Sequence, residues 1–581
     1  MLGMRTIIVF FIPFLLISIE EAAENSIFVN QIGYLPQQIK YAVVTGEADS
    51  FRLFSLDQNK AVLSKKLSAS GYWPYSDETI KIADFSEYSV PGRYRIISNT
   101  GQSFPFLISQ KAYSDISKAA LKAFYYQRAS IDLPPRFAGK WARKAGHPDT
   151  VVYIHPSAVG KTRPAGSVIS APGGWYDAGD YNKYVVNAGI TTYTLLLLYE
   201  LYPQYFDSLS LNIPESGNNI PDILDEVLWE IRWLMRMQDP DDGAIYHKLT
   251  CADFQPYIMP DQSTAKRYVV GKSTSAALNF AALLAHASVT FKIYKKGLPG
   301  LSDSCLSMSK KAWQWARQHP DQYFSNPDDI KTGVYGDNDL KDEFFWAGIE
   351  LFLATGDTSY FINMDKIEQM VLDSLYWKHT ANLGILTLIT HKSKLKNKPT
   401  QLQKIEALFK KNVEAIYNNY RTSPYKISLH TFKWGSNANL LNQTALLLTA
   451  YRVYNEPNFY KAALANTDYI LGRNPLNICY VSGFGSYSPQ NIHQRIMEAD
   501  GVKEPIPGFV VGGPNKYFLT DCGKEKYPSL LPAKCYVDDV CSYSTNEVAI
   551  NWNAALAFVL NSLNYYSYTS HSNIQIIEVS R

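Results

Sequence analysis

The feature that most constrains this chain is a change in hydrophobic periodicity near residue 110. From Ser26 to about Ile108, short β-rich runs such as YAVVTG, FRLFSL and GRYRIIS are separated by turn residues. From Ala112 onward, apolar residues recur at helical spacing, beginning with AYSDISKAALKAFYYQR. This change predicts a small all-β sandwich over residues 26–110, followed by an all-α unit over residues 111–581.

The helical part contains roughly a dozen segments that carry an apolar stripe. Examples are ITTYTLLLLYELY, STSAALNFAALLAHASVTF and NLLNQTALLLTAYRVY. Such a number suits a barrel of paired helices. Periodicity alone does not separate a barrel from a helical solenoid, although no repeat of fixed length is evident.

The amino terminus has the layout of a secretion signal. Arg5 precedes an apolar run from Thr6 to Ile19, and the small residues Ala22 and Ala23 follow. The run is shorter than the ~20 residues that span a bilayer, so we expect a signal peptide over residues 1–23, a secreted protein (extracellular or periplasmic) and no membrane attachment after cleavage. Export permits disulfides among the six cysteines, whose pairing the sequence does not reveal.

Charge and composition exclude some classes of partner. The formal net charge is only +3, with acidic and basic residues dispersed, so the chain lacks the basic footprint of a nucleic-acid-binding protein. Aromatic residues make up 14% of the chain. Their rings can stack on sugars or fill a core, so this share alone does not identify a ligand.

The first candidate for chemistry is the segment GGWYDAGDYNKY, residues 173–184, which is expected to hold Asp177 and Asp180 in a glycine- and aromatic-rich turn before an apolar helix. If this segment is helical, the three-residue spacing places both carboxylates on one face, and the helix N-terminus favours their anionic form. The alternative is that one aspartate caps the helix and the other is solvated.

A second candidate is Glu547 in YVDDVCSYSTNEVAINWNAA, residues 536–555. A carboxyl group among aromatic residues can have its pKa raised by desolvation and remain a proton donor. The start of a helix would favour the ionised form instead, and an acid just after Thr545 could simply be a capping residue. A third segment, YVSGFGSYSPQNIHQRI, carries His493 and Arg495, two donors able to hold sugar hydroxyls.

Together these segments resemble glycoside hydrolase family 9, the cellulase family E. DAGDY matches the site of the nucleophilic water, His493-Gln494-Arg495 matches the H-x-R signature, and the run from Tyr536 through Glu547 to Ala554 matches the C-terminal acid signature. VNQIGYLP, residues 29–36, resembles the immunoglobulin-like module of one branch of the family. Further matches, in the family's order, are KSTSAALNFAA, DEFFWAGIELFLATGD, KWGSN, GRNP and GFVVGGPN.

The resemblance implies an (α/α)6 barrel that hydrolyses β-1,4-glucosidic bonds with inversion at the anomeric carbon. It assigns Asp180 as the general base, Asp177 as the residue that helps orient the water, and Glu547 as the general acid. His493 and Arg495 would bind the sugar beside the scissile bond, with Tyr543 nearby. The aromatic candidates for sugar platforms are Trp175, Trp346 and Trp434, each of which could equally be a core residue.

The resemblance also bears on metals, none of which the chemistry requires. Relatives often bind calcium near the segment that matches Asp342 and Glu343, together with an aspartate from a later W-D motif. Here Lys378 follows Trp377, which weakens that site, although oxygen ligands are plentiful nearby. We expect no zinc, because no cysteine precedes Cys251.

The leading prediction is a secreted, monomeric endo-β-1,4-glucanase, a cellulase that degrades a polysaccharide. The alternatives within the enzyme class are a cellodextrinase, a xyloglucanase or an exo-glucosaminidase. A non-catalytic glucan-binding protein is disfavoured because both aspartates and Glu547 are present. We expect the N-terminal module to pack on the barrel as a support.

Overall fold

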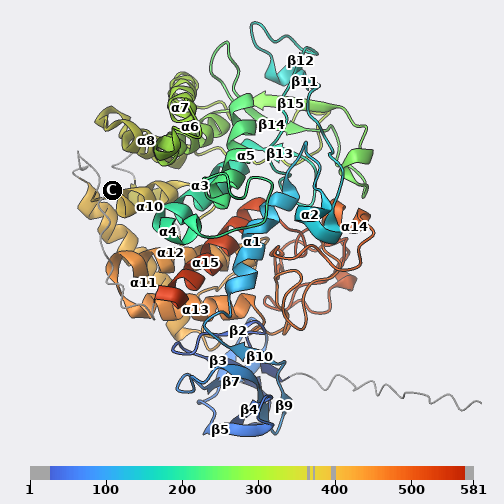
Figure 1. Cartoon of the computed structure of the whole chain (residues 1–581), viewed down its shortest axis with the longest axis vertical. Helices are drawn as coiled ribbons and strands as arrows, with labels where there is room; N and C mark the ends of the chain where they lie inside the picture. Colours follow the sequence, from blue (N-terminus) through green and yellow to red (C-terminus); the bar gives the residue numbers. More distant parts are fainter. Residues whose placement is uncertain (1–25, 363–366, 371–372, 394–400, 570–581) are drawn as a thin grey trace, which may run out of the picture.

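The computed structural model describes residues 26–362, 367–370, 373–393 and 401–569. A small β-module occupies one end of the molecule, and a larger helical unit forms the rest (Figure 1). The predicted signal peptide, residues 1–23, lies outside the described residues.

The β-module is a sandwich of two sheets, as the sequence predicts. One sheet has the strand order β1-β3-β7-β6, and the other has the order β2-β10-β8-β4-β5, with β9 paired to β8. Alternate residues of β4 face inward, where Phe51 and Leu53 are buried in the module's own core. The strands are β1 (Ile27–Phe28), β2 (Gly33–Tyr34), β3 (Tyr41–Thr45), β4 (Ser50–Ser55), β5 (Lys60–Lys66), β6 (Gly71–Trp73), β7 (Glu78–Asp84), β8 (Gly92–Ser98), β9 (Gly101–Gln102) and β10 (Phe106–Ile108).

The helical unit has an inner and an outer group of helices. Within the described ranges, six helices are buried on nearly every side: α3 (Val185–Leu201), α6 (Thr274–Thr290), α8 (Lys341–Thr355), α10 (Ala381–Thr390), α12 (Ser436–Tyr454) and α15 (Ile550–Thr569). The others are α1 (Ser114–Gln127), α5 (Asp222–Arg236), α7 (Leu301–Gln318), α9 (Ile367–Met370), α11 (Leu402–Thr422), α13 (Pro457–Ile470) and the short α2 (Pro135–Ala138), α4 (Pro203–Asp207) and α14 (Arg495–Ala499).

One of the inner helices is apolar enough to raise the question of a membrane span. By length and composition the segment Thr274–Tyr294, which includes α6, could cross a membrane, but most of it is buried inside the protein. This burial is what we expect of a helix at the centre of a helical core.

A sheet that the sequence did not predict lies beside the helices. Its strand order is β12-β11-β15-β14-β13, and β13 leads directly into α3 (Figure 1). The strands are short, and β14 is buried at every position, so neither length nor alternation marks them in the sequence. They are β11 (Val152–Ile154), β12 (Val168–Ile169), β13 (Lys183–Tyr184), β14 (Tyr246–Thr250) and β15 (Arg267–Lys272).

The β-module packs on the helical unit through polar and aromatic contacts, which confirms the predicted packing. The buried Asn30 donates a hydrogen bond to Asp468 Oδ1 at 2.8 Å. The Trp73 ring lies 4.2 Å from that of Tyr425, centroid to centroid. Trp73 belongs to the same continuous hydrophobic core as the helices.

Candidate active site

The DAGDY segment forms a tight turn ahead of α3, as the sequence predicts, so the three-residue spacing of its aspartates is not a helical one. The main-chain N–H of Asp177 donates to the carbonyl of Asn182 at 3.0 Å, and α3 begins only at Val185. The first residue of α15, Ile550, donates its N–H to the carbonyl of Asp177 at 2.8 Å. The turn is therefore fixed against the start of the last inner helix, and it brings both aspartates together without helical geometry.

The two aspartates are buried and differ in their partners. Asp177 accepts hydrogen bonds from the Asn187 amide and the Tyr335 hydroxyl, both at 2.7 Å. Asp180 accepts two at Oδ2, from Asn182 at 2.5 Å and Tyr184 at 3.1 Å. No described protein group bonds to Oδ1 of Asp180. This buried oxygen is thus available to accept a proton from a small molecule.

Glu547 meets this turn from the far end of the sequence. Its Oε1 accepts a hydrogen bond from the Gly179 N–H at 3.3 Å, and its main chain forms a parallel bridge with His493. We expected Glu547 at the start of a helix, but α15 starts three residues later, at Ile550. The stabilising dipole that would favour its ionised form is therefore weaker at this position.

Gly179 allows the three segments to approach closely. A Cβ atom at this position would lie 2.2 Å from the main-chain oxygen of His493 and 3.1 Å from Oε1 of Glu547. Its φ angle is not in the left-handed region, so the requirement for glycine here is one of space. At Gly179 the turn that carries the aspartates therefore touches the wall that carries Glu547, which is the bridged pair His493 and Glu547.

Arg495 binds the turn directly, whereas His493 is held by the loop that precedes Glu547. Arg495 donates from both its main-chain N–H and Nη1 to the Gly179 carbonyl, at 3.0 and 2.8 Å. His493 Nδ1 lies 2.6 Å from the Val540 carbonyl. Because a carbonyl can only accept, Nδ1 carries the proton and Nε2 remains as the acceptor. Burial lowers the pKa of His493 to about 4, so the ring is neutral at pH 7.

The three carboxyl groups have raised pKa values for the same main reason, which is burial. Burial and the charge of Asp180 raise the pKa of Asp177 to about 7. The pKa of Asp180 is raised by burial but held down by Arg495 and by its two hydrogen bonds. That of Glu547 is raised well above its usual range by burial and by Asp180. The surroundings therefore favour a proton on Glu547 more strongly than on Asp180.

Exposed and partly exposed aromatic rings lie beside His493 and Arg495. The Tyr543 ring lies 5.7 Å from that of His493 and 5.6 Å from that of Trp434, which is 46% exposed. Phe254 and Tyr257 are also exposed and lie against the Arg495 guanidinium. Rings placed in this way can cover the apolar faces of a sugar chain.

The structure corrects two of the three predicted sugar platforms. Trp175 is 1% exposed and packs against Phe124, 4.9 Å between ring centroids. Trp346 is fully buried and donates its indole N–H to Glu350 at 3.0 Å. Neither ring offers a face to a ligand, because each lies in the core.

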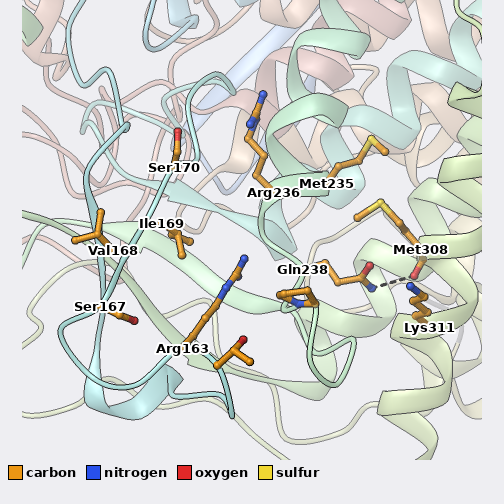
Figure 2. A pocket seen from close by; sticks show the side chains of 12 residues that line it. Arg163, Ser167, Val168, Ile169, Ser170, Met235, Arg236, Gln238, Met308 and Lys311 are labelled. Carbon is orange, nitrogen blue, oxygen red and sulfur yellow. Dashed lines mark hydrogen bonds between the residues drawn. The ribbon is translucent and has the colours of Figure 1, made fainter.

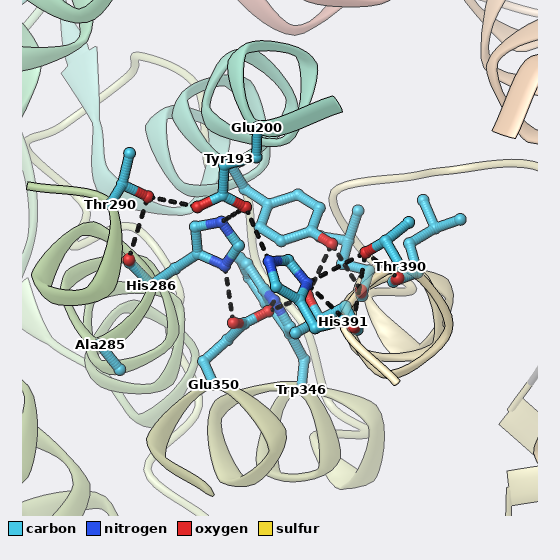
Figure 3. A network of polar contacts seen from close by, with 12 residues as sticks. Tyr193, Glu200, Ala285, His286, Thr290, Trp346, Glu350, Thr390 and His391 are labelled. Carbon is cyan, nitrogen blue, oxygen red and sulfur yellow. Dashed lines mark hydrogen bonds and ion pairs between the residues drawn. The ribbon is translucent and has the colours of Figure 1, made fainter. Parts of the chain in front are cut away.

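Trp346 belongs to a buried polar network among the inner helices (Figure 3). The His286 ring on α6 lies between two carboxylates, 3.0 Å from Glu200 on α3 and 2.8 Å from Glu350 on α8. His391, directly after α10, contacts Glu200 at 3.1 Å. These contacts raise the pKa of His286 well above its usual range despite its burial. The network ties four core elements together and does not include the three candidate catalytic carboxyl groups.

Several residues that bind the site's side chains, and that lie far from them in the sequence, were not predicted. Tyr335 and Asn187 bind Asp177, and neither had been singled out. Tyr257, which reaches Nδ1 of His493 at 3.0 Å, lies in a loop whose course the sequence did not indicate. For the residues that bind Asp180, the sequence offered one signal, because Asn182 and Tyr184 lie in the same DAGDYNKY segment.

The candidate calcium ligands partly fit a cation. Glu343 is fully buried, and no described group donates a hydrogen bond to either of its carboxylate oxygens. Oδ2 of Asp337 is similarly without a partner, whereas Asp342 accepts the Thr380 N–H at 2.5 Å. Lys378 contributes positive charge next to Asp337. These oxygens are hard ligands of the type calcium takes, and Lys378 opposes a cation as expected.

A hollow of about 800 Å³ lies elsewhere on the surface (Figure 2). Arg163, Arg236 and Lys311 line it, together with Met235 and Met308. Arg163 is already engaged with the Tyr246 hydroxyl at 3.2 Å. None of the three candidate catalytic carboxyl groups borders this hollow, and we assign it no function.

The cysteines show one pairing among the described residues. Cys522 and Cys541 form a disulfide within the loop that leads to Tyr543 and Glu547. The neighbouring Val540 provides the carbonyl that binds His493. The remaining cysteines are free and buried: Cys251, Cys305, Cys479 and Cys535.

Comparisons with known proteins agree with this geometry. A xyloglucan-specific endo-β-1,4-glucanase of Bacteroides ovatus is 40% identical over 556 residues, covering 93% of this chain and 94% of that protein. A cellodextrinase of Butyrivibrio fibrisolvens is 30% identical, covering 93% of this chain and 100% of its own.

Solved structures agree in fold. The Bacteroides ovatus GH9 structure superimposes with a TM-score of 0.86 at 37% identity, over 93% of this chain and 99% of that one. A thermostable endoglucanase from Alicyclobacillus acidocaldarius gives 0.84 at 31% identity, over 93% and 99%. The model of glycosyl hydrolase family 9 matches residues 113–560, and that of the cellulase N-terminal Ig-like domain matches residues 22–103. The chain is therefore a glycoside hydrolase of family 9 that carries an N-terminal cellulase Ig-like domain.

Proposed function

We propose that this enzyme cleaves internal β-1,4-glucosidic bonds of a glucan with inversion of the anomeric carbon. Asp180 is the general base: its free Oδ1 takes a proton from a water that attacks the anomeric carbon. Glu547 is the general acid, which gives its proton to the departing glycosidic oxygen. Asp177, held by Asn187 and Tyr335, orients the same water.

The observation that carries this proposal is the contrast between two buried carboxyl groups in one site. Asp180 receives two hydrogen bonds at one oxygen, and no described group bonds to its other oxygen. Glu547 receives one long hydrogen bond and faces negative charge, which keeps its proton in place. An inverting enzyme needs this pair of an ionised base and a protonated acid, roughly 6.5 to 9.5 Å apart.

His493, Arg495, Tyr543 and Trp434 would bind the glucan around the bond to be cleaved. The Nε2 of His493 can accept from a sugar hydroxyl, and the exposed Trp434 ring can stack on a sugar ring.

The second candidate substrate is a branched glucan of the xyloglucan type. The observation that favours it is the 40% identity, along nearly the whole chain, to an enzyme named for that specificity. Both candidates share a β-1,4-glucan backbone and the same three carboxyl groups, so only the tolerance for side chains differs.

The test measures the hydrolysis of carboxymethyl cellulose, xyloglucan and cellopentaose by the wild type and by the Glu547→Gln variant. An endo-acting enzyme lowers viscosity long before many reducing ends appear, and proton NMR of early products shows the α-anomer. A single small product with slow loss of viscosity would contradict endo action. A β-anomer product would contradict inversion.

Three further proposals accompany this function. We infer that the six inner helices and their outer partners close into an (α/α)6 barrel, because inner and outer helices alternate along the chain. We also propose export with cleavage near Ala23, which the mass of the secreted protein would reveal, and a monomer in solution, which light scattering would test.

We propose a structural calcium ion held by Glu343 and Asp342, with Asp337 as a further ligand. The orphaned oxygens of Glu343 support it. Calcium should raise the Tm of EDTA-treated enzyme, and Glu343→Gln should abolish that rise. An unchanged Tm on adding millimolar calcium would count against the site, and catalysis itself needs no metal or zinc in this account.

A further inference from the structure

Lys248 is a fully buried lysine that the mechanism above does not use. It lies on β14 directly opposite Tyr184 of β13, the tyrosine whose hydroxyl binds Asp180. A buried ammonium group is costly unless its hydrogen bonds are satisfied. Where its three donors go therefore shows what Lys248 holds in place.

All three donors of Lys248 go to one segment, residues 326–333. Nζ donates to the Asn326 side chain at 2.7 Å, to the Thr332 hydroxyl at 3.0 Å and to the Gly333 carbonyl at 2.7 Å. Residues 326–340 precede α8 and contain no helix or strand, so the lysine supplies order that regular structure does not.

This segment in turn holds both catalytic aspartates. The Gly333 N–H donates to the Tyr184 hydroxyl at 3.0 Å, and that hydroxyl donates to Asp180 at 3.1 Å. Two residues further along, the Tyr335 hydroxyl donates to Asp177 at 2.7 Å.

A second route leads from the same segment to Asp180. Thr332 shares a 2.7 Å hydrogen bond with Thr250, and Thr250 binds Asn182 at 2.9 Å. The Asn182 amide then donates to Asp180. Lys248 lies at the origin of both routes.

We infer that Lys248 is a positioning residue for the reaction, which anchors residues 326–333 so that Tyr184, Asn182 and Tyr335 hold the two aspartates in place. The inference rests on the proposed roles of Asp177 and Asp180. Loss of the anchor would misplace the base and the water it activates, and misplacement by about 1 Å can cost roughly 100-fold in rate.

The chain offers a matched control in Lys40. This lysine is also fully buried, and it donates to three oxygens, of Pro36, Gln38 and Ser86, at 2.7 to 3.0 Å. It lies in the β-module, away from the carboxyl groups of Asp177, Asp180 and Glu547. Lys40→Met therefore removes an equivalent buried ammonium without touching the aspartates.

The experiment compares wild type, Lys248→Met and Lys40→Met by hydrogen exchange of a peptide spanning residues 326–335 and by pH profiles of kcat and KM on cellopentaose. Lys248→Met should expose that peptide to exchange and lower kcat by about 100-fold, with KM changed less than about threefold. The acid limb of its pH profile should move to higher pH, because Asp180 loses the Tyr184 hydrogen bond that lowers its pKa and also the nearby charge of Lys248, while Arg495, Arg267, Asp177 and Glu547 still face it. Lys40→Met should change none of these.

Unchanged exchange in Lys248→Met would overturn the inference, whatever the activity. The inference would also be overturned if the peptide exchanged faster in Lys248→Met while kcat and the acid limb of its pH profile stayed as in the wild type. If Lys248→Met does not fold, Thr332→Val removes one link and should show the same changes to a smaller degree. An inactive wild type would refute the proposed function instead, and the exchange result would still decide whether Lys248 anchors the segment.

Discussion

The contact at Gly179 makes a quantitative prediction about the catalytic geometry. In Gly179→Ala, the new methyl group would lie 2.2 Å from the His493 carbonyl oxygen, so the turn that carries both aspartates must move away from the wall that carries Glu547. Relieving that contact requires a shift of about 1 Å, which can cost roughly 100-fold in rate. This corresponds to a loss of about 2.7 kcal/mol of transition-state stabilisation.

The assay is kcat/KM on cellopentaose, with the folded state checked by circular dichroism and thermal unfolding. Gly297→Ala is the control, because a Cβ there meets no atom closer than 3.9 Å. We expect the control to match wild type and Gly179→Ala to fall about 100-fold while remaining folded. A folded Gly179→Ala variant within threefold of wild type would refute the claim that the turn and the Glu547 wall must stay in contact.

Three other perturbations have defined outcomes. Tyr335→Phe removes a hydrogen bond that lowers the pKa of Asp177, so the acid limb of kcat/KM should move to higher pH, with a loss of about tenfold; an unmoved limb would contradict this. Cys522→Ser should lower the free energy of unfolding by about 3 kcal/mol, measured by urea denaturation, because the disulfide closes a long loop. His286→Gln should lower Tm most between about pH 4.5 and 6.5. The raised pKa of His286 contributes stability that is full below about 6.5 and is lost as the pH rises towards its folded pKa, and the lowered pKa of Glu200 contributes stability that is full above about 4.5. An equal loss of Tm at pH 9 would refute the charge assignment.

The β-module and the helical core could be predicted because many segments of one periodicity follow one another in each. The sequence also singled out Asp177, Asp180 and Glu547, which the structure brings into one site. The turn predicted for the aspartates is present and is closed by Asn182, and it brings them together without the helical geometry that their spacing would also allow.

The tryptophans and the supporting residues lay beyond what the sequence could show. Burial distinguishes Trp175 and Trp346 from the exposed Trp434, and burial depends on packing between distant segments. Lys248 lies in a sheet of strands only two to six residues long, and Tyr335 lies in a segment without regular structure, so neither leaves a periodic signal. Their roles follow only from three-dimensional contacts.

The division of labour between Glu547 and Asp180 is tested most directly by the dependence on the leaving group. The measurement compares Glu547→Gln and Asp180→Asn on cellopentaose and on a dinitrophenyl β-cellobioside, whose leaving group needs no proton. We predict that Glu547→Gln loses cellopentaose hydrolysis but keeps most of its activity on the dinitrophenyl substrate, whereas Asp180→Asn loses both. Equal loss of both activities in Glu547→Gln, or retained activity in Asp180→Asn, would contradict the assignment of acid and base.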